Sequence, residues 1–104
     1  MIIGKVIGNV WATRKDERLN GFKFLVVKSL YQDNKIFVAA DAGVGAGLED
    51  LVLIVSGSSA RVSLDKKSDI PIDATIVGVI DKVDIDKTFG VTPTIWHEIL
   101  IWTK

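Results

Sequence analysis

The chain has 104 residues, 48% of them hydrophobic, which fits one domain with a modest apolar core. Its 13 Lys and Arg residues balance 13 Asp and Glu residues, so no net field attracts nucleic acid, anionic membranes or acidic substrates. The absence of cysteine excludes disulfides, thiolate nucleophiles and cysteine metal centres, and no signal peptide or membrane-spanning run is recognisable, which fits a cytoplasmic protein.

The first half of the chain is predicted to form three strands. Residues 2–13 alternate as a half-buried strand does, with Lys5 and Asn9 outside, and residues 22–31 form a second strand after a polar connection. The polar residues 32–35 predict a tight hairpin that returns the chain into a third strand at residues 36–40. The parity expected to face the core in the first strand consists of Ile2, Gly4, Val6, Gly8, Val10 and Ala12.

The second half begins with a loop that has glycine at alternate positions, Gly43, Gly45 and Gly47. Such glycines suit positive φ angles or close approach to another surface. The short apolar run 51–55 predicts a buried strand, and residues 56–59 predict a turn. A single helical turn is expected at residues 64–69 before Pro71.

Two further β segments complete the chain. Residues 74–83 are β-branched and contain Gly78, which disfavours a helix. Residues 94–103 are apolar on both parities, so a C-terminal strand there is expected to pack on a neighbour or on the barrel. We therefore predict one mainly β domain over residues 1–104, a small OB-like barrel with a short helical turn and an atypical apolar tail at residues 88–104.

Catalytic, cofactor and metal sites are not expected. The glycine loop lacks the G-x-G-x-x-G spacing of a dinucleotide site and the Lys-Ser/Thr pair of a Walker A loop. Ser58 and Ser59 have no nucleophile elbow around them, and His97 is the only histidine. The acidic residues near Asp81 lack the spacing of a calcium loop.

An OB-like barrel could instead be a monomeric module that binds single-stranded nucleic acid. Such modules stack bases on exposed aromatic side chains beside basic ones. The candidates here are Phe22, Phe24, Tyr31 and Phe37, with Lys23, Lys28 and Lys35 nearby. The neutral charge and the lack of a basic stripe favour phenylalanines in the core and lysines on a solvated rim.

Arg61 ends the serine-rich segment after the buried strand, and its guanidinium can bind carbonyl groups or a carboxylate across a contact. An ordinary exposed arginine fits the pattern equally well. Asp41, Asp73 and Asp81 are its possible acidic partners, and the sequence does not choose among them.

The order of several short motifs resembles the EutN/CcmL family of shell vertex proteins from bacterial microcompartments. The similarity extends over residues 1–83, and only the combination of motifs is specific. The N-terminal motifs are Gly4 to Gly8, Ala12 to Lys15, and Ala39-Ala40-Asp41. The later ones are Gly45-Ala46-Gly47, Val52-Leu53, Gly57-Ser58-Ser59-Ala60-Arg61, Pro71-Ile72-Asp73 and Val79-Ile80-Asp81.

The resemblance implies a non-enzymatic homopentamer that closes the corners of a protein shell together with hexameric shell proteins. A cyclic ring needs two different faces of each subunit to meet. The residues expected at the subunit interface or the axial pore are Gly45, Ala46, Gly47, Gly57, Ser58, Ser59, Ala60, Arg61 and Asp81. The chain departs from the family in its short loop at residues 32–35 and in its hydrophobic tail.

Overall fold

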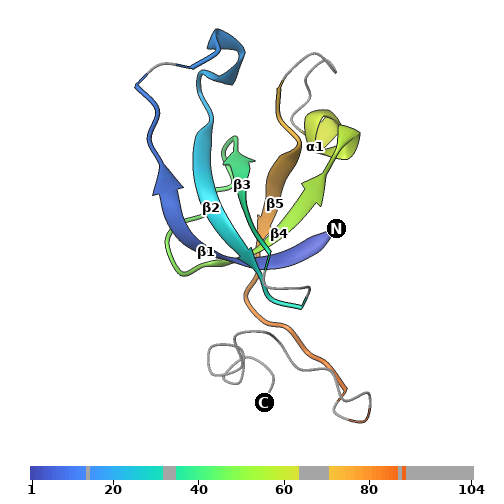
Figure 1. Cartoon of the computed structure of the whole chain (residues 1–104). Coiled ribbons are helices and arrows are strands. Elements are labelled where there is room, and N and C mark those ends of the chain that lie inside the picture. Colours follow the sequence, from blue (N-terminus) through green and yellow to red (C-terminus); the bar gives the residue numbers. More distant parts are fainter. Residues whose placement is uncertain (14, 32–34, 64–70, 87, 89–104) are drawn as a thin grey trace.

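The computed structural model describes residues 1–13, 15–31, 35–63, 71–86 and 88, with residues 61–63 described as backbone. Its strands form a closed barrel in the order β1-β2-β3-β5-β4 (Figure 1). A six-residue helix, α1, lies between β4 and β5, and a 3-10 turn precedes β2. The elements are β1 (Ile2–Val10), the 3-10 turn (Glu17–Leu19), β2 (Lys23–Ser29), β3 (Ile36–Asp41), β4 (Leu51–Ser56), α1 (Ser58–Ser63) and β5 (Ala74–Val79).

The sequence predicted this fold class correctly, and each of these five strands falls within or beside its predicted range. Neighbouring strands pair antiparallel except β3 and β5, which are parallel and joined through Ala40 and Thr75. The hydrogen bond from Ser29 N to Lys35 O, 2.8 Å long, closes the predicted hairpin between β2 and β3. The C-terminal strand expected at residues 94–103 lies outside the described residues.

The helical element differs from its prediction. Residues 56–59 were expected to be a turn only, yet Gly57 alone makes the turn with φ of 65°, and α1 begins at Ser58. Serine is common both in turns and at the start of helices, so the pattern did not distinguish the two. The helical turn expected at residues 64–69 lies outside the described part of the chain.

A β-bulge in β1 makes half of the predicted alternation wrong. The register with β2 shifts between Val6 and Gly8, and one additional residue moves every later side chain to the opposite face. Ile2, Gly4 and Val6 point to the interior as predicted, whereas Val10 and Ala12 are exposed.

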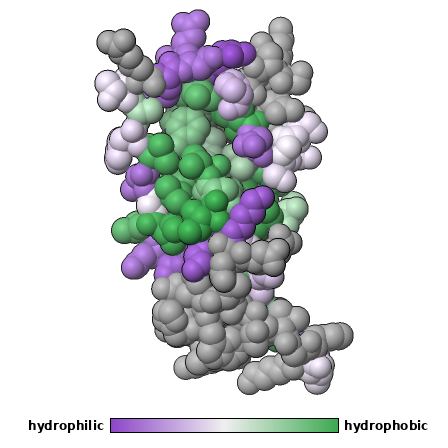
Figure 2. Space-filling model, viewed as in Figure 1, coloured by the Kyte–Doolittle hydropathy of each residue, from purple (hydrophilic) through white to green (hydrophobic). Residues whose placement is uncertain are grey.

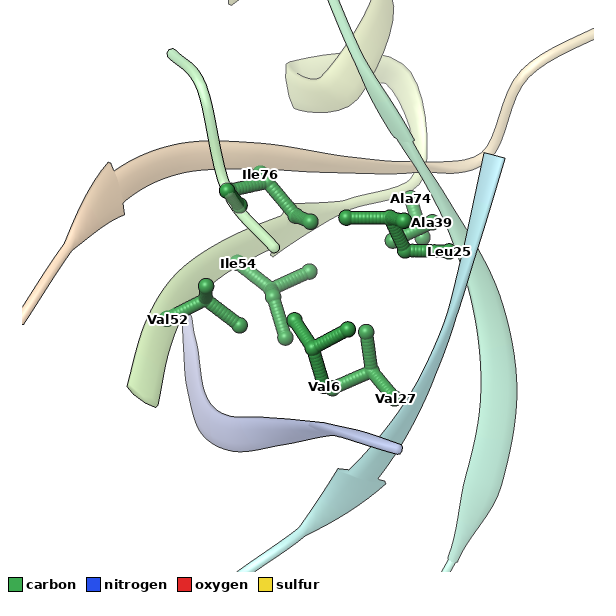
Figure 3. Packing of buried hydrophobic residues seen from close by; sticks show 9 residues of the cluster. Val6, Leu25, Val27, Ala39, Val52, Ile54, Ala74 and Ile76 are labelled. Atoms are coloured by element: carbon green, nitrogen blue, oxygen red, sulfur yellow. The ribbon is translucent and has the colours of Figure 1, made fainter. Parts of the chain in front are cut away.

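The barrel interior is filled by buried apolar side chains from all five strands (Figure 3). Gly4 permits this packing, because a Cβ atom at that position would lie 2.5 Å from Val27 Cγ1. The cluster also contains Ala46 from the glycine loop, which ties that loop to the interior. Its buried members are Val6, Leu25, Val27, Ala39, Ala46, Val52, Ile54, Ala74 and Ile76.

Candidate functional site

The glycine loop after β3 is organised around the carboxylate of Asp41, the last residue of that strand. Asp41 is only 3% exposed and accepts four backbone hydrogen bonds. Its Oδ1 accepts from the N–H groups of Gly43 at 2.9 Å and Val44 at 2.7 Å. Its Oδ2 accepts from Gly45 at 3.1 Å and Ala46 at 2.8 Å. One side chain therefore fixes four consecutive peptide groups.

Two glycines give the loop the backbone conformation that aims these N–H groups inward. Gly43 has φ of 150° and Gly45 has φ of 87°, values that side chains make unfavourable. A Cβ atom at either position would meet no heavy atom within 4 Å. Backbone conformation, and not lack of space within the chain, therefore accounts for glycine at Gly43 and Gly45.

Lys23 supports the same carboxylate from β2. Its Nζ lies 3.9 Å from Asp41 Oδ2 and donates a hydrogen bond to the carbonyl oxygen of Ala46. Burial raises the pKa of Asp41, but the backbone N–H bonds and Lys23 together outweigh it, so the pKa lies below its ordinary value. Asp41 is therefore charged at neutral pH.

This arrangement explains why the loop is not a phosphate cradle. Successive N–H groups that converge on one point form a binding site for an anion. Here the carboxylate of Asp41 already occupies that point and uses the N–H groups of residues 43–46. The spacing argument from the sequence and the geometry thus reach the same conclusion.

The far end of the loop is joined to β1. Asp50 Oδ2 accepts from Gly47 N at 2.8 Å, and Glu49 N and Asp50 O form hydrogen bonds of 2.9 Å with the backbone of Val6. Between these anchors the side chains of Val44 and Leu48 are 41% and 61% exposed. The loop thus holds two apolar side chains outward on a fixed backbone.

The second predicted segment packs against the start of β5. Gly57 N donates to Asp73 O at 2.7 Å, and Thr75 Oγ1 donates to Ala60 O at 3.1 Å. Ser58 and Ser59 are exposed, whereas Ala60 is completely buried. The side chain of Arg61 is outside the description, so its partner among Asp41, Asp73 and Asp81 stays open.

The structure does not gather all predicted site residues in one place. Ser56 pairs with Ala74, which sets Gly57 and Ser58 beside the beginning of β5. Asp81 is exposed beyond the other end of β5, where Ile80 N donates to Leu51 O at 2.8 Å. The side chain of Ala46 lies in the barrel interior, so only the backbone of Ala46 can reach a partner.

The aromatic residues proposed for base stacking are packed against the protein. Phe22 and Phe24 lie in a cluster with Leu19, Ala40 and Ile72. Phe37 packs on the interior cluster, and Tyr31 packs near Leu30 and Leu51. They do not form an open aromatic platform, so this geometry gives the nucleic-acid alternative no support.

The described residues were also compared with the requirements of a metal site, a membrane span and a catalytic base. No three His, Cys, Asp or Glu side chains there are placed to hold a metal ion together. No helix in that part of the chain is long and apolar enough to cross a membrane. His97, considered as a base for Ser58 or Ser59, is not among the described residues.

The sequence did not reveal the role of Asp41, which was considered as a possible partner for Arg61 and as part of the Ala39-Ala40-Asp41 motif. An available signal was an aspartate placed directly before a glycine-rich loop. Aspartate commonly accepts hydrogen bonds from the N–H groups that follow it in the chain. Four such bonds to one carboxylate could not be counted without the backbone geometry.

Fold and site together define a class of protein. It is a small OB-like barrel with a surface loop whose backbone N–H groups are hydrogen-bonded to a side chain of the same loop. Comparison with known proteins narrows this class. The family model described as "Ethanolamine utilisation protein EutN/carboxysome" matches residues 1–81. The chain belongs to this EutN/CcmL family.

Individual relatives agree over most of the fold. The shell vertex protein GrpN of Rhodospirillum rubrum is 44% identical over 81% of this chain and 97% of its own length. The carboxysome shell vertex protein CcmL of Thermosynechococcus vestitus is 43% identical over 83% of this chain and 89% of its own. The solved pentameric GrpN superposes with a TM-score of 0.72 at 42% identity, over 83% of this chain and all of GrpN.

Proposed function

We propose that this protein is a shell vertex component of a bacterial microcompartment, and that it assembles as a homopentamer without catalytic activity of its own. The observation that carries the proposal is the agreement with GrpN, a pentameric microcompartment shell protein, in both sequence and fold. Its partners at the corner are hexameric shell proteins, and its location is the shell of a compartment in the cytoplasm.

The exposed apolar surface of the single chain supports assembly. Figure 2 shows apolar residues gathered over the middle of the barrel, with polar residues above and below them. The strand registers bring Val26 of β2 and Val38 of β3 together on the outer face, and Val38 is 45% exposed. Contiguous exposed apolar surface of this kind marks a contact with another protein.

A cyclic ring requires two different faces on each copy. We assign one to the loop, with Val44 and Leu48 as anchors beside Gly45 and Gly47. The other is the outer face of β1, β2 and β3 around Val38. We assign the predicted residues Gly57, Ser58, Ser59, Arg61 and Asp81 to the junction or the pore, where Ala46 and Ala60 can contribute only their backbones.

The direct test is the mass of the native complex at micromolar concentration, measured with and without a hexameric shell protein. The proposal expects a five-chain ring that joins the hexamers into closed particles. Single chains that leave the shell sheets open would contradict it. Turnover of a small substrate by the purified ring would contradict the non-enzymatic part.

A further inference from the structure

Glu49, near the end of the glycine loop, stands where the turn geometry favours glycine. A hydrogen bond of 3.1 Å from Asp50 N to Gly47 O closes a turn over residues 47–50. Glu49 is the third residue of this turn and has φ of 72°, and every other described residue with a positive φ is a glycine. Positive φ at the third position alone is typical of a type II turn, which prefers glycine there because a Cβ atom is unfavourable. A strained residue of this kind motivates a search for its function.

The side chain of Glu49 is held on the outside of the loop. The residue is exposed, and its backbone N–H donates to Val6 O at 2.9 Å, which fixes the backbone at this point. No ion pair among the described residues includes its carboxylate. The preceding residue, Leu48, is 61% exposed. The loop therefore presents a negative charge beside an apolar side chain.

The other surface assigned to the ring carries the opposite charge. The strand registers place Lys28 of β2 opposite Ile36 of β3, next to the pair formed by Val26 and Val38. Lys5 of β1 lies opposite Lys28 on the other side, so two lysines are neighbours across the strands. None of the ion pairs within the described ranges includes Lys28. This outer face therefore combines apolar side chains with positive charge.

We propose that Glu49 of each copy forms an ion pair with Lys28 of the next copy in the ring, with Lys5 close to the same carboxylate. Leu48 then packs on the apolar side chains around Val38. This inference rests on the proposed ring and adds the residues that select which faces meet. Two loops in contact, or two strand faces, would bring like charges together, which disfavours both arrangements. The pair thus favours the head-to-tail contact that a cyclic ring requires.

Two substitutions of Glu49 separate a role in assembly from a role in the turn. Glu49→Gln removes the charge, and Glu49→Gly also supplies the residue that the turn prefers. Both should weaken each contact in the ring about 1.5- to 5-fold, the effect of one exposed ion pair. Native mass measured over a dilution series reports this weakening, and the difference from the natural chain should largely disappear in about 1 M salt. A purely local role predicts rings at least as strong for Glu49→Gly, and that result would overturn the proposal.

Exchanging the two charges tests the pairing itself. Glu49→Lys and Lys28→Glu should each weaken the ring, and the double variant should restore it; a double variant as weak as the single ones overturns the pair. Glu17→Gln is the control, because Glu17 is exposed in the 3-10 turn outside both ring surfaces. Its rings should match those of the natural chain.

A disulfide shows whether the contact joins two copies, because the natural chain has no cysteine. Oxidised Glu49→Cys with Lys28→Cys should give a ladder of linked chains on a denaturing, non-reducing gel. An internal disulfide, or no disulfide in intact rings, overturns the pair. A natural chain that forms no ring overturns the proposed function and this pair with it, whereas unchanged rings in Glu49→Gln overturn the pair alone.

Discussion

The barrel interior and the glycine loop are both well packed, but different forces hold them. The interior depends on the many buried apolar side chains of its cluster, which come from all five strands and from Ala46 of the loop. The loop depends on the Asp41 carboxylate, which collects four N–H groups, and on Lys23 beside it. The comparison teaches that the stability of the interior depends on side-chain volume. The stability of the loop depends on the charge of Asp41 and on how many hydrogen bonds its side chain can accept.

The largest effect is expected from Gly4→Val in the interior. The added Cβ would lie 2.5 Å from Val27 Cγ1 and 3.1 Å from the carbonyl oxygen of Lys28, and a backbone atom cannot move aside cheaply. Overpacking typically costs about 1–3 kcal/mol, and a clash with backbone places this variant at the upper end of that range. Urea unfolding followed by circular dichroism measures the loss.

Gly8 on the same strand provides the control for that substitution. A Cβ there would meet Val26 Cβ at 3.7 Å, an ordinary contact distance. Gly8→Ala should therefore change the free energy of unfolding by less than about 1 kcal/mol. Equal losses in the Gly4 and Gly8 variants would refute the packing argument.

The next largest effect is expected from Asp41→Asn, which keeps the shape of the side chain. The amide NH2 group of Asn only donates hydrogen bonds. It would therefore face backbone N–H groups that donate to a carboxylate oxygen in the natural protein. We expect a loss of about 1.5–3 kcal/mol, the range for hydrogen bonds to charged groups. Faster hydrogen exchange at the amides of residues 43–46 would locate the damage in the loop.

Asp50→Asn is the matched control for this charge change. Asp50 accepts a side-chain hydrogen bond only from Gly47 N among the described contacts, so its amide can keep that bond. The exchange rates of residues 43–46 should then stay as in the natural protein. If both variants loosen the loop alike, the special role of Asp41 is wrong.

A smaller effect is expected from Gly45→Val. The φ of 87° at Gly45 is strained for a β-branched residue, at a cost of about 1–3 kcal/mol. Because the loop is also the assigned ring surface, assembly should weaken more than folding of the barrel. Gly47 has no positive φ, so Gly47→Ala is the control. The measurement pairs thermal unfolding with the mass of the assembly, and intact rings for Gly45→Val would contradict the assignment.

Lowering the pH should produce the smallest change in the free energy of unfolding, and this change should come from Asp41. The pKa of Asp41 is lowered in the folded state, so its stabilisation is complete above the ordinary aspartate pKa of about 3.9. It is lost as the pH falls through the lowered pKa, because protonation removes the charge but leaves oxygen acceptors. Unfolding free energies at several acidic pH values, compared with those of Asp41→Asn, measure this term. A pH dependence that persists unchanged in the Asn variant would assign it to other groups.

The sequence predicted where the five strands lie, and a period of two residues correctly identified Ile2, Gly4 and Val6 as interior positions of the first strand. The prediction was wrong beyond the bulge after Val6, which moves later side chains to the opposite face and exposes Val10. It also failed where one residue type serves two structures, as at Ser58 in α1.

For the site, the glycines marked a loop whose backbone the structure shows to be held by hydrogen bonds, but the role of each glycine was not predictable. Close approach and positive φ both call for glycine, and the backbone angles at Gly43 and Gly45 distinguish them. The role of Asp41 depends on four N–H groups that converge in space, which a linear pattern does not contain. The partner of Arg61 was left open for the same reason.

The central claim is that the rigid loop carries a contact between copies in the ring. It is tested most directly by the native mass of the double variant Val44→Asp and Leu48→Asp, beside Trp11→Asp, which places a single carboxylate at another exposed apolar residue. The account predicts folded single chains of 11.4 kDa for the double variant and five-chain rings for Trp11→Asp. Five-chain rings from the double variant would contradict it.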